Sequence, residues 1–290
     1  MRGLASPELK SQGRNVIDIS NSFQEQEWPL VSVLFVTYKR FDLLAQSVDA
    51  FVKHTDYPNY EIVISDDGSP LKIQDAIRAL PVEKRTVLPT RNRGLGANFN
   101  QGMAECRGKY ILTLQDDWKC HGPSDYLRTS VMLLEHHPLV GMILYTMGLA
   151  YRPESAAISG LKEIAYFYPD DASKRDYPYT YSDQPHLRRR EVNTVVGPYL
   201  EDRDMVKCEQ DYERRWDQQT VYKSAMFPAY WLKVFTCIGG EDRSFRETRL
   251  KNRTDRLLAP IANRLRSHKR LFRLGRTVVR KIQRLLGGFD

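Results

Sequence analysis

The 290-residue chain lacks the segments that would mark it as a membrane-spanning or secreted protein. No stretch reaches the roughly 18 uncharged apolar residues that a membrane-spanning helix needs. The best candidate, residues 131–150, is interrupted by Glu135, two histidines and a proline. The first residues have no apolar core of the signal-peptide type, so we expect a cytoplasmic protein. Internal repeats are also absent from the sequence.

Cysteine is scarce, and its spacing points to no metal site. The four cysteines include no Cys-x-x-Cys pair, and no histidine stands at zinc-site spacing beside them. A disulfide framework is unusual in a cytosolic chain of this length. We therefore predict four reduced thiols, at Cys106, Cys120, Cys208 and Cys237.

Acidic residues are nearly missing from the last part of the chain. Between Arg243 and Arg284 there are 15 Lys and Arg but two acids, a net charge of +13. The whole chain carries +8, so the remainder carries −5. A mildly acidic body with a strongly basic tail calls for two separate explanations.

Aspartate is present in a pattern that points to a ligand site. Two hydrophobic runs, 61–65 and 110–114, are each followed by a pair of aspartates, Asp66-Asp67 and Asp116-Asp117. In an open parallel sheet, ligands bind at the carboxyl ends of the strands. The two carboxylate pairs therefore suggest a site for a nucleotide and a divalent cation.

Strand-like and helix-like patterns alternate between residues 31 and 145, which predicts an α/β fold with a mostly parallel sheet between helices. The expected strands are 31–36, 61–65, 85–88, 110–114 and 140–145, and the expected helices lie around 43–51, 73–80, 94–107 and 124–136. From 151 to 200 the pattern is lost, and we expect an irregular, aromatic-rich segment over the strand ends. A charged helix is expected within 199–216.

Four blocks in this order, 31–40, 56–69, 92–108 and 110–118, resemble the successive blocks of family 2 glycosyltransferases with the GT-A fold. They carry Thr-Tyr-Lys-Arg, Asp-Asp-Gly-Ser, a stretch rich in Asn and Gly, and Gln-Asp-Asp. Each block is weak alone, but four in series are specific. The resemblance implies a glycosyltransferase domain over 30–242, with a nucleotide-binding half 30–118 and an acceptor half 119–242. Residues 1–29 are polar and without periodicity, so we expect a leader there, and the basic composition predicts an amphipathic helical tail over 243–290.

The resemblance assigns nucleotide-sugar binding to nine residues: Thr37, Tyr38, Arg40, Asp66, Asp67, Asn92, Gly94, Asn100 and Asp116. A carboxylate at the end of the second strand can accept the imide proton of uracil, and an aromatic ring can stack on the base. A UDP-sugar is therefore the expected donor. Without the other blocks, Asp-Asp-Gly-Ser could be no more than a turn.

The metal is expected at the second aspartate pair. The resemblance implies that Asp117 and Asp116 hold Mn²⁺ or Mg²⁺ against the diphosphate, since hard cations prefer carboxylate oxygens. Gln115 departs from the family pattern, which has aspartate there, and a neutral amide is a poorer ligand. A helix N-cap would explain one aspartate, but less easily both.

The helix after residue 199 is expected to supply the base. The resemblance places the general base at Glu209 and a second catalytic acid at Asp211, with Glu201 and Asp202 as rivals. Acids and arginines interleaved on one helix also form solvated ion pairs, which is the competing interpretation. Cys237 stands where some relatives have a histidine, and we expect it to be structural because a soft thiol suits Mg²⁺ poorly.

Apolar residues of the tail recur at helical spacing between arginines and lysines, which predicts an amphipathic helix over 257–286 on an anionic membrane surface. The alternatives are that the tail docks on the body or binds nucleic acid. Because no aromatic-rich nucleic-acid module accompanies the tail, we do not expect a nucleic-acid partner. The resemblance implies an inverting glycosyltransferase, and the basic tail suggests a place at the inner face of a membrane. It would act on a carbohydrate or lipid-linked acceptor in cell-surface polysaccharide or glycoconjugate synthesis. A nucleotidyltransferase and a non-catalytic GT-A module remain alternatives.

Overall fold

The computed structural model describes residues 16–18, 27–145, 154–159, 164–167, 181–226 and 234–239. The chain divides into two compact units, residues 1–238 and 239–290. The predicted tail, 243–290, with its membrane-binding segment 257–286, lies outside the described residues, as does most of the predicted leader, 1–29.

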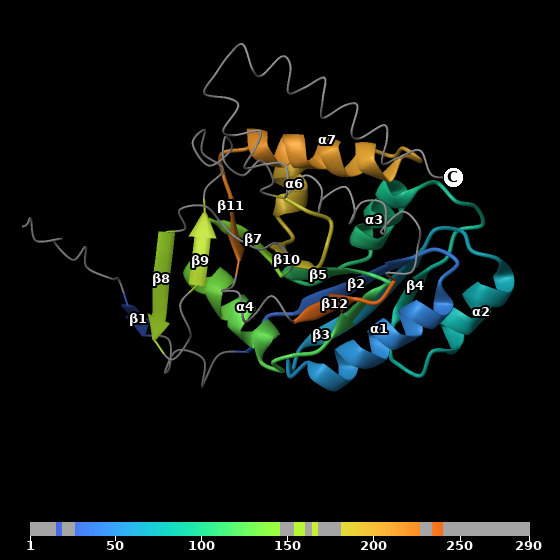
Figure 1. The fold of residues 1–290 in the computed structure, drawn as a ribbon, viewed down its shortest axis with the longest axis horizontal. Coiled ribbons are helices and arrows are strands. Elements are labelled where there is room, and N and C mark those ends of the chain that lie inside the picture. The colour runs from blue at the N-terminus through green and yellow to red at the C-terminus, as the bar shows by residue number, and fades with distance from the viewer. Residues whose placement is uncertain are drawn as a thin grey trace, which may run out of the picture. The chain divides into compact units, whose positions relative to one another are not determined.

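Among the described residues, ten strands form one sheet in the order β1-β8-β9-β11-β7-β10-β5-β2-β3-β4 (Figure 1). The mostly parallel sheet flanked by helices that the sequence predicts is confirmed. The strands are β1 (Val16–Asp18), β2 (Val31–Thr37), β3 (Tyr60–Asp66), β4 (Arg85–Val87), β5 (Tyr110–Gln115), β7 (Val140–Leu144), β8 (Glu154–Ser159), β9 (Ile164–Phe167), β10 (His186–Arg189) and β11 (Lys223–Met226).

Strand β2 runs parallel to its two neighbours, β3 and β5. Its residues Val33, Leu34 and Phe35 are completely buried, because helices cover both faces of the sheet. The register pairs Thr37 with Asp66 on one side and Val36 with Gln115 on the other. The carboxyl ends of three strands therefore meet at one edge.

Strand β10 departs from the prediction. It lies between β5 and β7 and runs antiparallel to both, so the prediction of an irregular segment over 151–200 is wrong there. The sequence His-Leu-Arg-Arg gives no signal of a central strand, because burying arginine requires dedicated partners. Arg188 Nη1 donates to the hydroxyl of Tyr212 at 2.8 Å, and Arg189 Nε donates to the carbonyl of Val140 at 2.8 Å.

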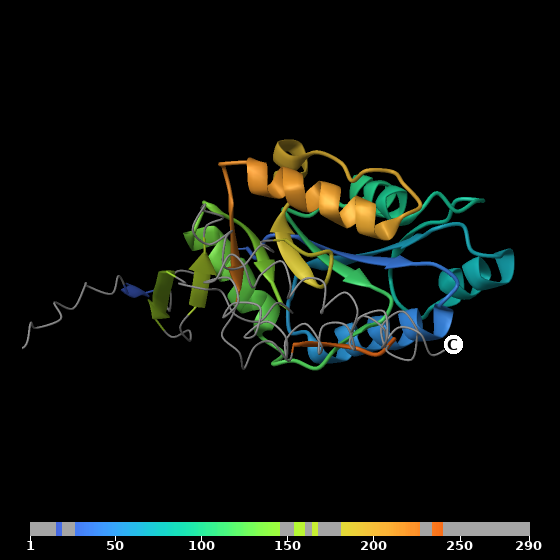
Figure 2. The same ribbon diagram turned by 45° about the horizontal axis from the view of Figure 1, so that its top comes forward.

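Helices lie on both faces of the sheet (Figure 2). On one face, Leu44 and Phe51 of α1 join Leu134 of α4 in a buried apolar cluster. On the other, Phe99 of α3 lies in a cluster with Trp216 of α7. No helix in the described part of the chain combines the length and apolarity needed to cross a membrane. The described helices are α1 (Phe41–His54), α2 (Leu71–Ala79), α3 (Leu95–Ala104), α4 (Tyr126–His136), α6 (Val192–Val196) and α7 (Met205–Gln218).

A separate two-stranded ribbon pairs β6 (Trp118–Cys120) with β12 (Phe235–Cys237). The amide of Ile238 donates to the carbonyl of Asp117 at 2.7 Å. The ribbon therefore brings residues 234–238 against the second aspartate pair, more than a hundred positions away in the sequence.

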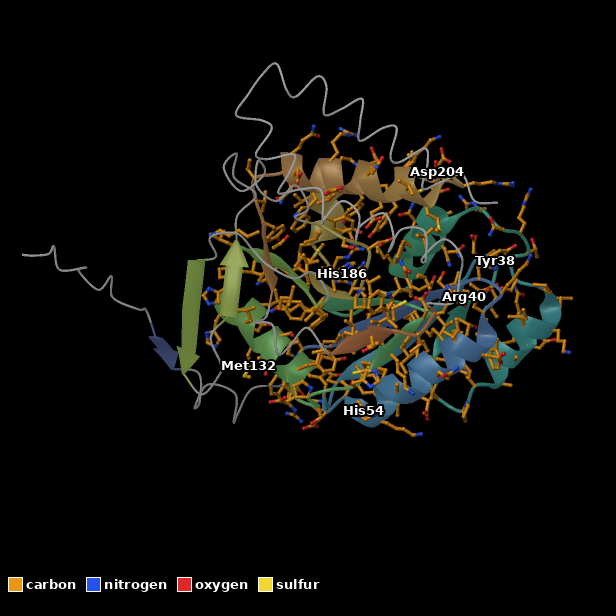
Figure 3. The ribbon with its side chains drawn as sticks, viewed as in Figure 1. Tyr38, Arg40, His54, Met132, His186 and Asp204 are labelled. Atoms are coloured by element: carbon orange, nitrogen blue, oxygen red, sulfur yellow. The ribbon has the colours of Figure 1, made fainter. Side chains whose placement is uncertain are left out.

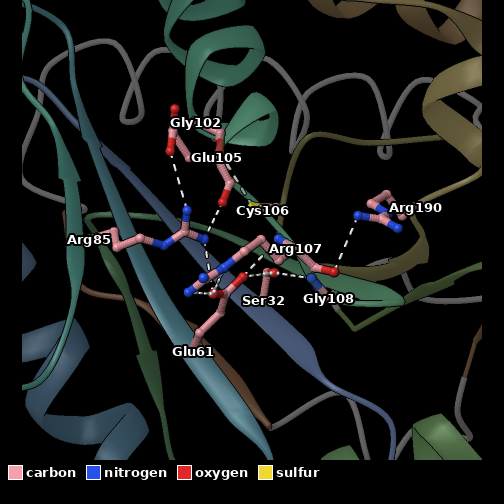
Figure 4. A network of polar contacts seen from close by, with 9 residues as sticks. All are labelled: Ser32, Glu61, Arg85, Gly102, Glu105, Cys106, Arg107, Gly108 and Arg190. Atoms are coloured by element: carbon pink, nitrogen blue, oxygen red, sulfur yellow. Dashed lines mark hydrogen bonds and ion pairs between the residues drawn. The ribbon is translucent and has the colours of Figure 1, made fainter.

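At the amino ends of the parallel strands, a network of charges surrounds Glu61 (Figure 4). Its Oε1 accepts hydrogen bonds from Ser32 Oγ at 2.6 Å and from the amide of Arg107 at 2.8 Å. Its Oε2 accepts from Arg85 Nη2 at 2.9 Å and from Arg107 Nε at 3.1 Å. We call this group the Glu61 network. Both oxygens of its carboxylate are saturated with donors.

Candidate active site

The predicted nucleotide and metal residues do meet at one edge of the sheet. Tyr38 and Arg40 follow the end of β2 (Figure 3), Asp66 ends β3, and Asp116 follows β5. Lys39, between Tyr38 and Arg40, has a φ of 60°, which is uncommon outside glycine. Its amide donates to Ser69 Oγ at 2.8 Å, and this bond ties the turn after β2 to the turn after β3.

One arginine bridges the second aspartate pair. Arg40 Nη1 lies 3.2 Å from Asp116 Oδ1, and its Nη2 lies 2.8 Å from Asp117 Oδ2. The other oxygen of Asp116 accepts a hydrogen bond from Thr37 Oγ1 at 2.8 Å. Burial raises the pKa of Asp116 to about 6, although Arg40 and Thr37 oppose this shift. The ionised form of Asp116 is therefore less favourable in the folded protein than it would be in water.

Asp117 has a carboxylate oxygen whose hydrogen-bonding capacity is unused among the described residues. Its Oδ1 is buried and accepts no hydrogen bond from any described residue. A buried carboxylate oxygen without a partner is costly, and a cation would satisfy it. The residues present therefore fit a divalent metal held by Asp117, with substrate phosphates and water as its other ligands. No group of three or more His, Cys, Asp or Glu within the described ranges is arranged to hold a metal.

The first aspartate pair is engaged by its own loops. Asp66 Oδ2 accepts from the amide of Ser69 at 2.7 Å and from Gln74 Nε2 at 3.1 Å. Asp67 accepts from the amides of Arg93 at 2.8 Å and Gly94 at 3.0 Å. Burial raises the pKa of Asp67 in spite of these two bonds. Both carboxylates therefore organise the turns that follow β3 and precede α3.

The Asn- and Gly-rich stretch lies against residues 199–202. A Cβ at Gly94 would lie 2.4 Å from the carbonyl oxygen of Asp202, and the φ of Gly94 is +96°. Asn100 Nδ2 donates to the carbonyl of Tyr199 at 2.9 Å, and Asn100 Oδ1 accepts from the amide of Tyr199 at 2.8 Å. Asn92 precedes this contact and is half-buried. Gly94 therefore permits the close packing of this stretch against residues 199–202, and Asn100 stabilises it with two hydrogen bonds.

Glu209 of α7 lies beside a carboxyl group that the sequence did not single out. Its Oε1 is 3.3 Å from Ser182 Oγ and 3.4 Å from the amide of Asp183, both donors. Burial first, and then the charge of Glu209 and a hydrogen bond to it, raise the pKa of Asp183 well above its ordinary value; the charge of Asp117 adds to this. Asp183 thus lies within electrostatic reach of both Glu209 and Asp117. No motif spacing flags it, because it precedes the unpredicted strand β10.

The other acids of this region are committed elsewhere. Asp211 accepts from Arg214 Nη2 at 2.7 Å and from Arg215 Nε at 2.8 Å. Although burial opposes it, these bonds lower the pKa of Asp211. Glu201 forms an exposed ion pair with Arg93. Asp202 Oδ1 accepts from the amide of Asp204 at 2.9 Å, just before α7 begins. Glu209 is thus the acid of this set that shares the site with Asp183.

All four cysteines are free thiols, as the sequence predicts. Cys237 lies in β12 opposite Trp118. Burial opposes the charge of Arg40, but Asp116 and Asp117 outweigh it and raise the pKa of Arg40, and Cys237 adds a smaller contribution. This position puts the thiol at the border of the aspartate site.

Solved structures of low sequence identity share this fold. A mannosyltransferase from Pyrobaculum calidifontis, in complex with GDP-Man and Mn²⁺, aligns with a TM-score of 0.52 and 18% identity, over 75% of this chain and 58% of that one. S. aureus TarS 1–349 in complex with UDP-GlcNAc aligns with a TM-score of 0.51 and 16% identity, over 69% and 56%. The class of protein is therefore an α/β protein with the GT-A fold.

Residues 32–153 match the family model of glycosyl transferase family 2. A protein of Mycobacterium tuberculosis described as uncharacterized is 25% identical over 224 residues, 75% of this chain and 57% of that protein. Galactofuranosyltransferase GlfT1 of Mycolicibacterium smegmatis is 32% identical over 89 residues, 31% and 28% of the two chains. The chain spans less than two thirds of the length of these relatives.

Proposed function

We propose that the protein is an inverting, metal-dependent glycosyltransferase that moves a sugar from a nucleoside diphosphate sugar to an acceptor hydroxyl. The observation that carries this proposal is the buried Oδ1 of Asp117, which has no described partner and lies where three parallel strands end. A ligand cation satisfies such an oxygen, and open α/β sheets bind ligands at this edge.

The residues at the edge divide the work. The turns held by Asp66 and Asp67 form the floor for the nucleobase, with Tyr38 available to stack on it. Arg40 places a positive charge beside Asp116 and Asp117, where the diphosphate would lie. A divalent metal on Asp117 would supply positive charge to the departing nucleoside diphosphate.

Glu209 is the proposed general base. An acceptor hydroxyl must lose its proton as its oxygen attacks the anomeric carbon. In a single displacement the new carbon–oxygen bond forms while the bond to the diphosphate breaks on the opposite face, which inverts the configuration. Glu209 takes the proton.

For the donor we propose a UDP-sugar and Mn²⁺ or Mg²⁺. Support comes from two structures of the same fold, one in complex with GDP-Man and Mn²⁺ and the other with UDP-GlcNAc. For the acceptor we propose a carbohydrate or a lipid-linked sugar, in cell-surface polysaccharide or glycoconjugate synthesis. The net charge of +13 between residues 243 and 284 supports an anionic membrane surface as the place of action.

Nucleotide release tests the proposal. Full-length protein with Mn²⁺ would be offered UDP-, GDP- and dTDP-sugars one at a time, beside Asp117→Ala and the control Asp75→Ala, whose carboxylate is 70% exposed on α2. We expect metal-dependent release from one donor, retained in the control and lost in Asp117→Ala. Metal-dependent binding without release would indicate the non-catalytic module instead. Absence of both would refute the proposed site.

A further inference from the structure

The guanidinium of Arg40 lies on the two carboxylates that would hold the metal. Its Nη1 is 3.2 Å from Asp116 Oδ1 and its Nη2 is 2.8 Å from Asp117 Oδ2, so one side chain bridges both aspartates. The two aspartates and Arg40 together leave a single negative charge, which is less than the charge of a divalent cation. Like charges on one carboxylate repel each other. In the free protein, Arg40 therefore opposes a cation at the unpartnered Asp117 Oδ1.

The Arg40 side chain has few other attachments. Its described hydrogen bonds and ion pairs go to these two aspartates, and the side chain is 39% exposed. Arg215 provides the contrast, because it pairs with Asp211 but also donates to the backbone carbonyl of Pro198 at 2.8 Å. A guanidinium that carboxylates alone hold can leave when another anion offers it charge-assisted hydrogen bonds. The Arg40 guanidinium is therefore able to change partners.

The positions of the two aspartates do not depend on Arg40. The carbonyl of Asp116 accepts from Ser47 Oγ at 2.7 Å, and its Oδ2 accepts from Thr37 Oγ1 at 2.8 Å. The carbonyl of Asp117 is bonded to the amide that follows β12. Departure of the guanidinium would therefore leave both carboxylates in place, with more negative charge between them.

We propose that Arg40 competes with the divalent cation for Asp116 and Asp117 in the free protein, and that a nucleoside diphosphate draws its guanidinium onto the phosphates. The cation then binds tightly only together with the nucleotide. The inference rests on the proposed function and deepens it, because it names the residue that couples the two ligands. Arginine suits both partners, since its planar fork matches carboxylate and phosphate oxygens and it stays charged throughout.

The exchange of partners accounts for the coupling. When the guanidinium passes to the phosphates, the two aspartates present their full negative charge to the cation, and the phosphates gain a positive partner. No covalent bond changes in this step. By linkage, the cation and the nucleotide must raise each other's affinity by the same factor.

Binding of Mn²⁺ alone is the first test and requires no turnover. We expect Arg40→Gln to bind Mn²⁺ about 10-fold more tightly than wild type, because the competing charge is removed and the aspartates remain. Arg78→Gln is the matched control, since it removes the same charge from an exposed ion pair on α2 and should leave the Mn²⁺ affinity unchanged. Electron paramagnetic resonance of free Mn²⁺ measures these affinities. An unchanged or weaker Mn²⁺ affinity in Arg40→Gln would overturn the proposal.

Addition of UDP is the second test. We expect UDP to raise the Mn²⁺ affinity by about 50-fold in wild type and by about 5-fold or less in Arg40→Gln. UDP binding in the presence of Mn²⁺ should be weaker in Arg40→Gln, so the substitution strengthens one ligand and weakens the other. Loss of both affinities would indicate a merely structural role for Arg40 and overturn the proposal. Equal coupling in the two proteins would also overturn it, because the guanidinium would then not change partners.

A crystal structure of the wild-type protein with UDP and Mn²⁺ tests the inference even if the variant does not fold. We expect the Arg40 guanidinium within hydrogen-bond distance of a phosphate oxygen and no longer of Asp117 Oδ2. Arg40 still bridging both aspartates beside a bound cation would overturn the proposal. Coupled binding without sugar release from any donor would uphold it and refute the glycosyltransferase function alone. Sugar transfer with equal Mn²⁺ affinities in wild type and Arg40→Gln would overturn the inference and leave the function standing.

Discussion

Both ends of the parallel strands carry an acidic side chain beside arginine and a hydroxyl, but the pKa values of the two acids are shifted in opposite directions. At the amino ends, in the Glu61 network, burial opposes ionisation, but bonds from Ser32 and Arg107 and the charge of Arg85 outweigh it and lower the pKa of Glu61. At the carboxyl ends, Asp116 also has a hydroxyl and an arginine as partners, yet burial raises its pKa to about 6.

The difference lies in how many donors reach each carboxylate. Two arginines, a hydroxyl and a backbone amide serve the single carboxylate of Glu61, whereas Arg40 is divided between two aspartates. The amino end therefore stabilises the fold. The carboxyl end keeps an unfilled demand for positive charge, which a cation can meet.

The largest effect separates function from stability at the carboxyl end. We expect Asp117→Asn to weaken metal-dependent nucleotide binding by about 100-fold or more, because the site loses the charge of a carboxylate whose buried Oδ1 has no partner among the described residues. Its midpoint of thermal unfolding should change little, since an amide oxygen can still accept from Arg40 and the buried Oδ1 has no described partner to lose. Calorimetric titration with UDP and Mn²⁺, beside thermal unfolding, measures both. A drop in stability with binding intact would reverse the roles of the two ends.

The converse substitution addresses the amino end. Glu61→Gln should lower the free energy of unfolding by about 2 kcal/mol, because it removes hydrogen bonds to charged donors from a carboxylate that is 13% exposed. Nucleotide binding by the folded fraction should be unchanged. Urea unfolding measures the loss, and Glu105→Gln is the matched control. Glu105 pairs with the same Arg85 but is 51% exposed, so we expect a change within about 0.5 kcal/mol. Equal losses in the two variants would contradict the role given to Glu61.

Sequence patterns predicted the parallel half of the fold because its strands are continuous apolar runs bounded by turns. The strands at 31–36, 61–65 and 110–114 were confirmed within one or two residues. Strand β10 could not be predicted, because its arginines are compatible with the sheet only through distant partners such as Tyr212 and Val140. Local patterns carry no information on such partners.

The candidate site, like the fold, was predicted only in part from the sequence. The topology brings Thr37, Arg40, Asp116 and Asp117 together, as their positions after strands predict. Asp183 was missed because it precedes the unpredicted strand. The sequence also gave no indication that Asn100 bonds to the backbone of Tyr199, since an amide that binds a ligand and one that binds the chain have the same local pattern.

The smallest predicted effect extends the comparison to the stability–pH profile. Burial, then the charges of Asp217 and Glu209, raise the pKa of Glu213 on α7 from 4.5 to about 7. For Glu135, near the amino end of β5, burial is outweighed by bonds from Lys109 and Tyr110, and its pKa is lowered. The two glutamates should therefore respond to amide substitution with opposite signs.

The fold holds the proton of Glu213 more tightly than the unfolded chain does, so the wild-type protein loses stability as pH rises from about 4.5 to 7. Glu213→Gln should therefore gain about 1 kcal/mol at pH 8, a value reduced for solvent screening of a half-buried group, and the gain should vanish below about pH 4.5. Glu135→Gln should lose a similar amount at pH 8, because its ionised form is favoured by the fold, and this loss should also vanish in acid. Urea unfolding of both variants at pH 4 and pH 8 gives the two differences. The same sign for both at pH 8 would contradict the opposite pKa shifts of the two glutamates.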